Sequence, residues 1–360
     1  MKTKRLSPAP GALLALTLAA LACGGGPAVE PSATPFGPTA KPAATRKPTP
    51  ANAGESPLQL AQAAYDHPSG AFSVTLPDGW EVKDRDFSVF VNAPDSVASI
   101  EISFVTTGVE LDADGLGKLI DANETNWFAG FDSYAEESRE PQNDGSIGVL
   151  KTLVLADGTP QTVFSYYWAE GTIVYEQDFW VNTDQYDAYI GGLLDVANSM
   201  TTDPQAGSEA PLYAITYTFV DPERGLFQFD VPFAWIYATD TGDNTRIDTF
   251  TSPDGLAFVD NIAYDDGQAV SKSDAGDFAL ILLRKSYDLD DLKVTGDEVQ
   301  QDGSERLDWT SASRGLRGES FFETHGTTFL LLTWAATAED YDTLAGVWSN
   351  LLDTYQVPES

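Results

Sequence analysis

The feature that most constrains this chain is an internal repeat in which matching residues lie 155 positions apart. The matches occur near both ends of the repeat and include rare residue types. The matched pairs are Asp66 and Asp221, Gly70 and Gly225, Phe72 and Phe227, Pro77 and Pro232, Trp80 and Trp235, Gly171 and Gly326, Tyr186 and Tyr341, Asp187 and Asp342, and Gly191 and Gly346. Between them, Pro94-Asp95 matches Pro253-Asp254 four residues further on. This self-similarity predicts two copies of one domain.

Each copy contains the same series of hydrophobic patterns. Alternating apolar and polar residues predict strands, and apolar residues at helical spacing predict two helices in each copy. The expected strands include 58–65, 99–105, 161–170 and 172–181 in the first copy and 212–220 and 257–263 in the second. The expected helices are 114–129 and 184–200, then 274–285 and 339–355. Runs of antiparallel strands with segregated helices predict an α+β sandwich.

These patterns also set the domain boundaries. The first domain is expected at 58–200 and the second at 211–357. The turn-forming stretch 201–210 is predicted to be a short linker between them.

The N-terminal segment 1–23 has the features of a signal peptide. Its basic residues are Lys2, Lys4 and Arg5, and the following apolar run of about 11 residues is shorter than the roughly 20 that span a bilayer. Ala20-Leu21-Ala22-Cys23 resembles a lipobox, the site at which bacterial lipoproteins are diacylated on cysteine. We therefore expect lipid attachment at Cys23 and an extracytoplasmic location, at the cell surface or in the periplasm.

Residues 24–57 follow the predicted lipid site and contain eight prolines. Such composition is typical of an extended, semi-rigid linker, which at about 3.1 Å per residue reaches at most roughly 100 Å. The segment is predicted to be a stalk that holds the two domains away from the membrane.

The net charge of −35 restricts the partners of the chain. A surface this acidic repels nucleic-acid phosphates, so we expect no nucleic-acid binding. Cations such as Ca²⁺ are compatible with it, and acidic clusters could supply oxygen ligands. These clusters are Asp112 and Asp114; Asp240, Asp243, Asn244 and Asp248; Asp265 and Asp266; and Asp288, Asp290 and Asp291. Their spacing does not match an EF-hand, and solvated surface is the favoured interpretation.

The chain lacks the residues that most enzymes and zinc sites require. Cys23 is the only cysteine, and the two histidines, His67 and His325, have no counterpart in the other copy. Both histidines lie next to turn residues and are expected to be solvated. Nucleophilic catalysis needs a base, usually histidine, beside the nucleophile. A zinc site needs three or four ligands, usually cysteine or histidine. We therefore expect no enzymatic activity, no cofactor and no transition-metal site.

Aromatic residues are concentrated in the strands of the central meander. Tyr166 and Trp168 share one face of a predicted strand because side chains alternate along it. This face either belongs to the core, which is the favoured interpretation, or is an exposed aromatic binding surface. Phe321 of the second copy would also belong to such a surface. The matched residues Trp80 and Trp235 are predicted to be core.

The run Phe72-x-Val74-x-x-Pro77-x-Gly79-Trp80 resembles the opening of the PsbP-like superfamily, the relatives of the photosystem II extrinsic subunit. The order of the following strands and helices is similar over nearly all of each copy. The resemblance implies a compact antiparallel sheet with helices on both sides. It transfers no catalytic residues, since members are mainly assembly, binding or stress-related accessory proteins.

Together these features predict a membrane-anchored, non-enzymatic lipoprotein. Its leading expected role is to bind or scaffold another protein. The alternative is an extracytoplasmic receptor for a small molecule or for a cation such as calcium, and an enclosed pocket with convergent polar groups would favour this alternative.

Overall fold

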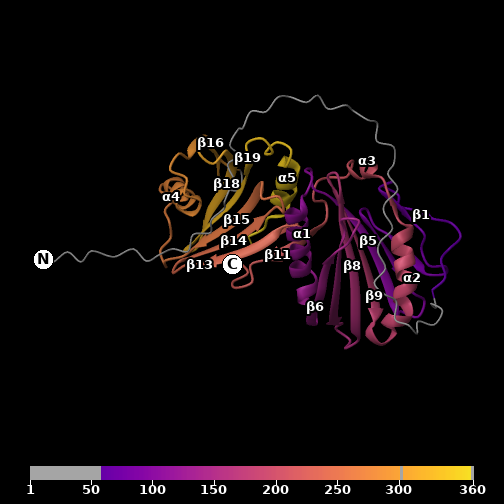
Figure 1. Cartoon of the computed structure of the whole chain (residues 1–360). Coiled ribbons are helices and arrows are strands. Elements are labelled where there is room, and N and C mark those ends of the chain that lie inside the picture. Colours follow the sequence, from indigo (N-terminus) through magenta and orange to yellow (C-terminus); the bar gives the residue numbers. More distant parts are fainter. Residues whose placement is uncertain (1–57, 301–302, 358–360) are drawn as a thin grey trace, which may run out of the picture. The chain divides into compact units, whose positions relative to one another are not determined.

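The computed structural model describes residues 58–300 and 303–357 (Figure 1). The predicted signal segment 1–23, with Cys23, and the predicted stalk 24–57 lie outside the described residues. The described chain contains two repeats, each built on its own antiparallel sheet of seven strands.

The strands of the first sheet are β3 (Glu81–Asp84), β4 (Ser88–Asn92), β5 (Ala98–Thr106), β6 (Asp132–Pro141), β7 (Ile147–Val154), β8 (Pro160–Glu170) and β9 (Ile173–Asn182). Their order across the sheet is β3-β4-β5-β9-β8-β7-β6. The hairpin of β8 and β9 turns at Gly171, whose φ of 60° lies in the left-handed region that favours glycine. This hairpin agrees with the one predicted from the sequence.

The strands of the second sheet are β13 (Ile236–Thr241), β14 (Thr245–Thr251), β15 (Ala257–Tyr264), β16 (Lys293–Val299), β17 (Glu305–Ser311), β18 (Leu316–His325) and β19 (Thr328–Thr337). Their order, β13-β14-β15-β19-β18-β17-β16, is the order of the first sheet. The cross-strand pair Trp168 and Tyr175 becomes Glu323 and Leu330 at the same offset of 155 residues. The structure therefore supports the internal repeat strand by strand.

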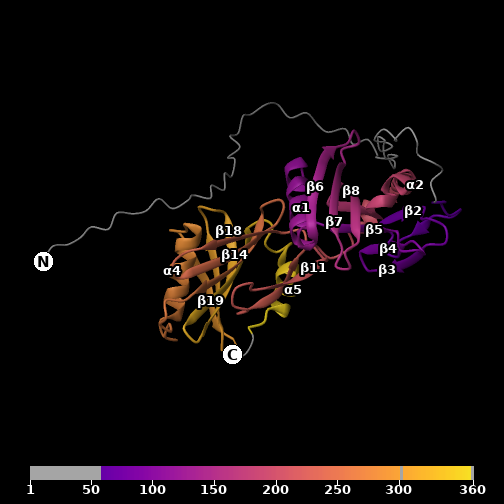
Figure 2. The same cartoon turned by 90° about the horizontal axis from the view of Figure 1, so that it is seen from below.

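Helices pack on both faces of each sheet. They are α1 (Ala113–Asn126) and α2 (Tyr186–Ser199) in the first repeat, and α4 (Ala275–Tyr287) and α5 (Ala345–Thr354) in the second. Figures 1 and 2 show α1 and α2 on opposite sides of the first sheet. Because strands outnumber helices, the architecture is mostly β, and the predicted α+β class describes it only approximately.

The two apolar layers of each repeat follow from the alternation of side chains along its strands. On β5, Ile100 and Ile102 pack in one cluster with Leu193 of α2. In the second repeat, Ile262 packs with Leu283 of α4 on one face of the sheet. The other face of that sheet carries the core beneath α5, and the pocket described below opens there.

Shorter elements accompany each main sheet. In the first repeat β1 (Tyr65–Asp66) and β10 (Thr201–Thr202) pair on either side of β2 (Phe72–Val74). In the second, β11 (Thr216–Val220) pairs with β12 (Gln228–Pro232). Two 3-10 turns, η1 (Phe128–Gly130) and η2 (Thr183–Gln185), adjoin α1 and α2.

The opening strand predicted over 58–65 is wrong over most of its length. Only Tyr65 belongs to a strand, and Leu60 forms a single bridge with Pro77. Two backbone hydrogen bonds flank this bridge, from Ala61 to Leu76 and from Asp78 to Gln59, and the pairing ends where Asp78 and Gly79 turn the chain. The matching strand predicted over 212–220 likewise begins later, at Thr216.

The segment predicted as a linker, 201–210, has regular structure. Its first two residues form β10, and Pro204–Gly207 form the short helix α3. The Asp203 carboxylate caps this helix by accepting hydrogen bonds from the backbone N–H groups of Gln205 and Ala206.

Candidate functional site

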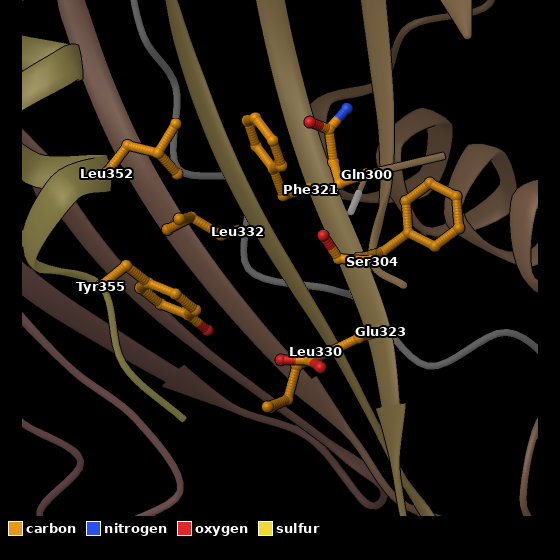
Figure 3. A pocket seen from close by; sticks show the side chains of 9 residues that line it. Gln300, Ser304, Phe321, Glu323, Leu330, Leu332, Leu352 and Tyr355 are labelled. Atoms are coloured by element: carbon orange, nitrogen blue, oxygen red, sulfur yellow. The ribbon is translucent and has the colours of Figure 1, made fainter. Parts of the chain in front are cut away.

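The second repeat contains a pocket of about 460 Å³ between β18, β19 and the end of α5 (Figure 3). This volume lies within the range of small-molecule sites, about 300–1,000 Å³. The lining residues are Gln300, Ser304, Phe321, Phe322, Glu323, Leu330, Leu332, Leu352 and Tyr355. The pocket is formed by residues of one repeat alone.

The walls of the pocket differ in polarity. Leu330 and Leu332 on β19 are each 1% exposed, and Phe321 and Leu352 are half-buried beside them. Figure 3 shows the Glu323 carboxylate and the Tyr355 hydroxyl extending from opposite walls toward the same space. The pocket therefore combines an apolar wall with a polar end, as sites for amphipathic ligands do.

Tyr355 is oriented by a buried amide. The Nδ2 atom of Asn261, on β15, donates a hydrogen bond of 2.8 Å to the Tyr355 hydroxyl oxygen. Asn261 is fully buried, and its Oδ1 atom has no hydrogen-bond partner in the described chain. Burial raises the pKa of Tyr355 well above its ordinary value, while the hydrogen bond from Asn261 opposes this effect and the Glu323 charge adds to it. The phenol is therefore neutral and can donate its hydrogen to a ligand.

The equivalent space in the first repeat is filled by aromatic side chains. Trp168 and Tyr175 stand where Glu323 and Leu330 stand in the second repeat. Their rings stack at 5.3 Å between centroids, and they are 4% and 0% exposed. The pocket therefore arises because a charged and a smaller side chain replace a stacked aromatic pair.

The structure places the predicted aromatic residues in two environments. Tyr166 and Trp168 belong to the core beneath α2, so neither is on an exposed face. Phe321 is half-buried and lines the pocket. Glu323, Tyr355 and Asn261 escaped the sequence analysis. One feature of the sequence could have identified Glu323: it stands 155 residues after Trp168, at the matching position of the other copy. A carboxylate in place of a buried tryptophan indicates that packing is lost there.

Both sheets carry a buried row of polar side chains on the face opposite α2 or α5. In the first repeat, Glu101 and Ser165 flank Asp178, which accepts a hydrogen bond from the Ser165 hydroxyl. In the second repeat, Asp260 and Ser320 flank Thr333 in the same way. Each repeat therefore holds an acid on its third strand, half-buried in the case of Glu101 and buried in the case of Asp260.

Burial raises the pKa of Glu101 to about 7, with the charge of Asp178 adding to the effect and Arg85 opposing it. Burial raises the pKa of Asp260 to about 6. A folded-state pKa above the unfolded value means that folding favours the protonated acid. This stabilisation is complete below about pH 4 and is lost as the pH rises through 6 to 7.

We therefore expect the free energy of unfolding to fall between pH 5 and pH 8, by roughly 2–3 kcal/mol from Glu101 alone. Urea unfolding at several pH values measures this, and Glu101→Gln and Asp260→Asn should flatten the dependence. The exposed Glu110→Gln is the matched control and should leave the slope unchanged. A slope in Glu101→Gln and Asp260→Asn as steep as that of the unmodified chain would contradict the prediction.

A buried ion pair joins α1 to the first sheet. The Lys151 ammonium lies 2.6 Å from the Glu124 carboxylate, and Lys151 is fully buried. The hydroxyls of Tyr134 and Tyr167 donate to the same carboxylate, at 2.6 and 3.4 Å. The ammonium also lies 3.3 Å from the centroid of the Phe128 ring. These partners compensate the removal of both charges from water.

The expectation that His67 is solvated is wrong, because the residue is 2% exposed. Its Nε2 atom lies 3.1 Å from the carbonyl oxygen of Arg85, and its ring stacks on Phe72 at 4.7 Å. Its Nδ1 atom bonds the nearby Ser69 hydroxyl within the same turn. His67 therefore fixes a loop. His325 lies half-buried at the end of β18.

The acidic clusters are largely engaged in local bonds. Asp248 accepts a two-pronged hydrogen bond from the Arg246 guanidinium, and Asp291 bonds the hydroxyls of Ser311 and Ser313. Within residues 58–300 and 303–357, no group of three or more Asp, Glu, His or Cys side chains is arranged to hold a metal ion.

None of the helices in the described part of the chain is both long and apolar enough to cross a bilayer.

No model of a known protein family matches the sequence. No curated protein matches it either.

Solved structures show weak similarity. The solution structure of cyanobacterial PsbP (CyanoP) from Synechocystis sp. PCC 6803 has 13% identity and a TM-score of 0.33, over 40% of this chain and 94% of that one. A crystal structure from Bacteroides thetaiotaomicron VPI-5482 has 15% identity and a TM-score of 0.29, over 44% and 53%. A di-domain ARO/CYC, BexL, from the BE-7585A biosynthetic pathway has 8% identity and a TM-score of 0.15, over 71% and 90%. Similarity at this level carries no inference about function.

Proposed function

We propose that this chain is a lipid-anchored extracytoplasmic binding protein whose second repeat holds a small amphipathic molecule. The observation that carries the proposal is the pocket of about 460 Å³ with an apolar wall and a polar end. Of the two roles expected from the sequence, this pocket favours the small-molecule receptor. The role as a scaffold for another protein stays a prediction.

The anchoring part of the proposal rests on the lipobox-like run that ends in Cys23 and on the Pro-rich segment 24–57. Several acyl chains hold a protein stably at a membrane, whereas a single chain binds only marginally. We further propose that both repeats are PsbP-like domains. The run from Phe72 to Trp80 and the antiparallel sheets with helices on both sides support this assignment.

The two repeats would then have different roles. The first has a filled aromatic core at the position where the second has a pocket. Duplication allows one copy to keep the packing while the other acquires a site. Binding is therefore assigned to the second repeat alone.

This assignment predicts that the pair Glu323→Trp and Leu330→Tyr abolishes ligand binding, because it restores the aromatic pair of the first repeat. The probe is N-phenyl-1-naphthylamine, a neutral dye that fluoresces in apolar sites. The protein is the full chain with Cys23→Ser, so that no lipid is attached. We expect the affinity for the dye to fall at least tenfold, as measured by fluorescence titration.

The matched control is Ile281→Trp, which adds an aromatic side chain at a position that is 56% exposed on α4. It should leave the affinity for the dye unchanged. Near-ultraviolet circular dichroism verifies that both variants are folded. A folded double variant with undiminished dye binding would refute the assignment of the site.

A further inference from the structure

We infer that the pocket selects amphiphiles with a cationic head group, and that Glu323 is the residue that sets this preference. The inference rests on the proposed function, since it names the class of ligand for the same pocket. The supporting observations are the charges around the pocket, the position and hydrogen bonding of the Tyr355 hydroxyl, and the burial of the apolar wall.

The charges near the pocket are predominantly negative. Glu323 contributes a carboxylate from β18. The cation on the neighbouring strand is Arg306, the cross-strand partner of Phe321. Arg306 lies 2.8 Å from the Glu319 carboxylate and 2.9 Å from that of Asp308, so two acids already compensate its charge. An entering anion would therefore meet excess negative charge, whereas an entering cation would not.

The position of Glu323 increases the effect of its charge. The side chain is half-buried at the end of a pocket whose apolar wall includes Leu330 and Leu332, which have almost no contact with water. Charges interact more strongly where low-dielectric walls replace solvent. An exposed carboxylate would be screened by salt, but one within the pocket retains more of its attraction for a bound cation.

Tyr355 can complete the coordination of the head group. Its hydroxyl oxygen accepts one hydrogen bond, from Asn261, which leaves a second lone pair for an ammonium N–H. Its own hydrogen can reach an acceptor atom of the ligand. Asn261 is thus a positioning residue, because it holds the phenol at the polar end without touching the ligand space.

The apolar wall determines what kind of tail the ligand can have. Leu330 and Leu332 present buried aliphatic surface, and Phe321 and Leu352 extend it. Each methylene group buried there strengthens binding, because it removes apolar surface from water. A short alkyl chain attached to an ammonium group therefore matches both parts of the pocket.

Three probes of equal chain length test the inference: octylamine, octanol and octanoate. At pH 7 the amine is protonated and the carboxylate is ionised, so the probes differ mainly in head-group charge. Calorimetric titration of the full chain with Cys23→Ser gives the three affinities. We expect octylamine to bind most tightly and octanoate at least tenfold more weakly.

Glu323→Gln is the decisive variant, because it removes the charge and keeps the shape. It should bring the three affinities to within about threefold of one another while octanol binding stays the same. Glu339→Gln removes one exposed charge outside the pocket and should leave the preference intact, which separates a local effect from the attraction of the whole acidic surface.

The outcomes separate the inference from the proposed function. Equal binding of octylamine and octanoate by the unmodified pocket would overturn the inference and leave the pocket as a binding site. A preference that survives in Glu323→Gln would overturn the role of Glu323. Absence of binding by all three probes, together with absence of dye binding, would overturn the proposed function itself.

Discussion

Replacing Lys151 by methionine is expected to lower the free energy of unfolding by about 3–5 kcal/mol. The variant removes one member of a buried ion pair and leaves the Glu124 carboxylate 5% exposed and without its counter-charge. Methionine fills a similar volume, so the loss is electrostatic rather than one of packing. The cost is large because a buried charge without a partner keeps its desolvation penalty.

Equilibrium urea unfolding measures this loss, and a second substitution identifies its cause. Glu124→Gln in the Lys151→Met background removes the uncompensated charge but keeps an acceptor for the hydroxyls of Tyr134 and Tyr167. We expect the double variant to recover more than half of the lost stability. If single and double variants unfold at the same urea concentration, the carboxylate charge is not the cause.

An exposed ion pair in α1 supplies the control. Lys118 lies 2.8 Å from the Asp114 carboxylate, but the side chains are 45% and 77% exposed. Exposed pairs of this kind contribute a few tenths of a kcal/mol. Lys118→Met should therefore change the stability by less than about 0.5 kcal/mol, despite a distance close to that of the buried pair.

The sequence predicted those parts of the fold that depend on short-range periodicity. Alternation of side chains located β5, β8, β9 and β15 to within a few residues, because each strand buries one or both faces. Helical spacing located α1, α2 and α4 in the same way. The closing helix of the second repeat was predicted from residue 339, but α5 begins at Ala345, because Asp340 and Leu344 instead form successive turns.

The candidate site depends on contacts that no local pattern reveals. Asn261 and Tyr355 lie 94 residues apart in sequence, and the Tyr355 ring packs against Phe227 and Phe229, which also lie far from it along the chain. Lys151 could not be recognised as buried, since a single lysine in a strand is usually solvated. His67 was misjudged because its turn residues suggest exposure, whereas Phe72 and the carbonyl oxygen of Arg85 enclose the ring.

The internal repeat supplies information that a single copy does not. At one pair of matched places, a neighbouring residue compensates the difference between the two copies. Lys151 pairs across strands with Val163 in the first repeat, and Trp309 pairs with Gly318 at the corresponding place in the second. A large indole thus stands opposite a residue without a side chain, so a side chain added at Gly318 should strongly affect stability.

Gly318→Ala is expected to lower the free energy of unfolding by about 2–3 kcal/mol. A Cβ atom at this position would overlap the indole ring of Trp309. That ring cannot move aside easily, because it is fully buried and its Nε1 atom donates a hydrogen bond of 2.9 Å to the Ser320 hydroxyl. Gly346→Ala, on the exposed side of α5 with open space around it, should be neutral or slightly stabilising.

A double-mutant cycle distinguishes this overlap from a general effect of the strand. Trp309→Leu alone costs stability by creating a cavity, but it also removes the atoms that the added methyl group would meet. The penalty of Gly318→Ala should therefore shrink by more than about 1 kcal/mol in the Trp309→Leu background. If the two penalties simply add, the glycine is not required by the indole. A strong coupling would mean that Trp309 of the second repeat requires Gly318 opposite it. At the corresponding places in the first repeat, Lys151 stands opposite Val163.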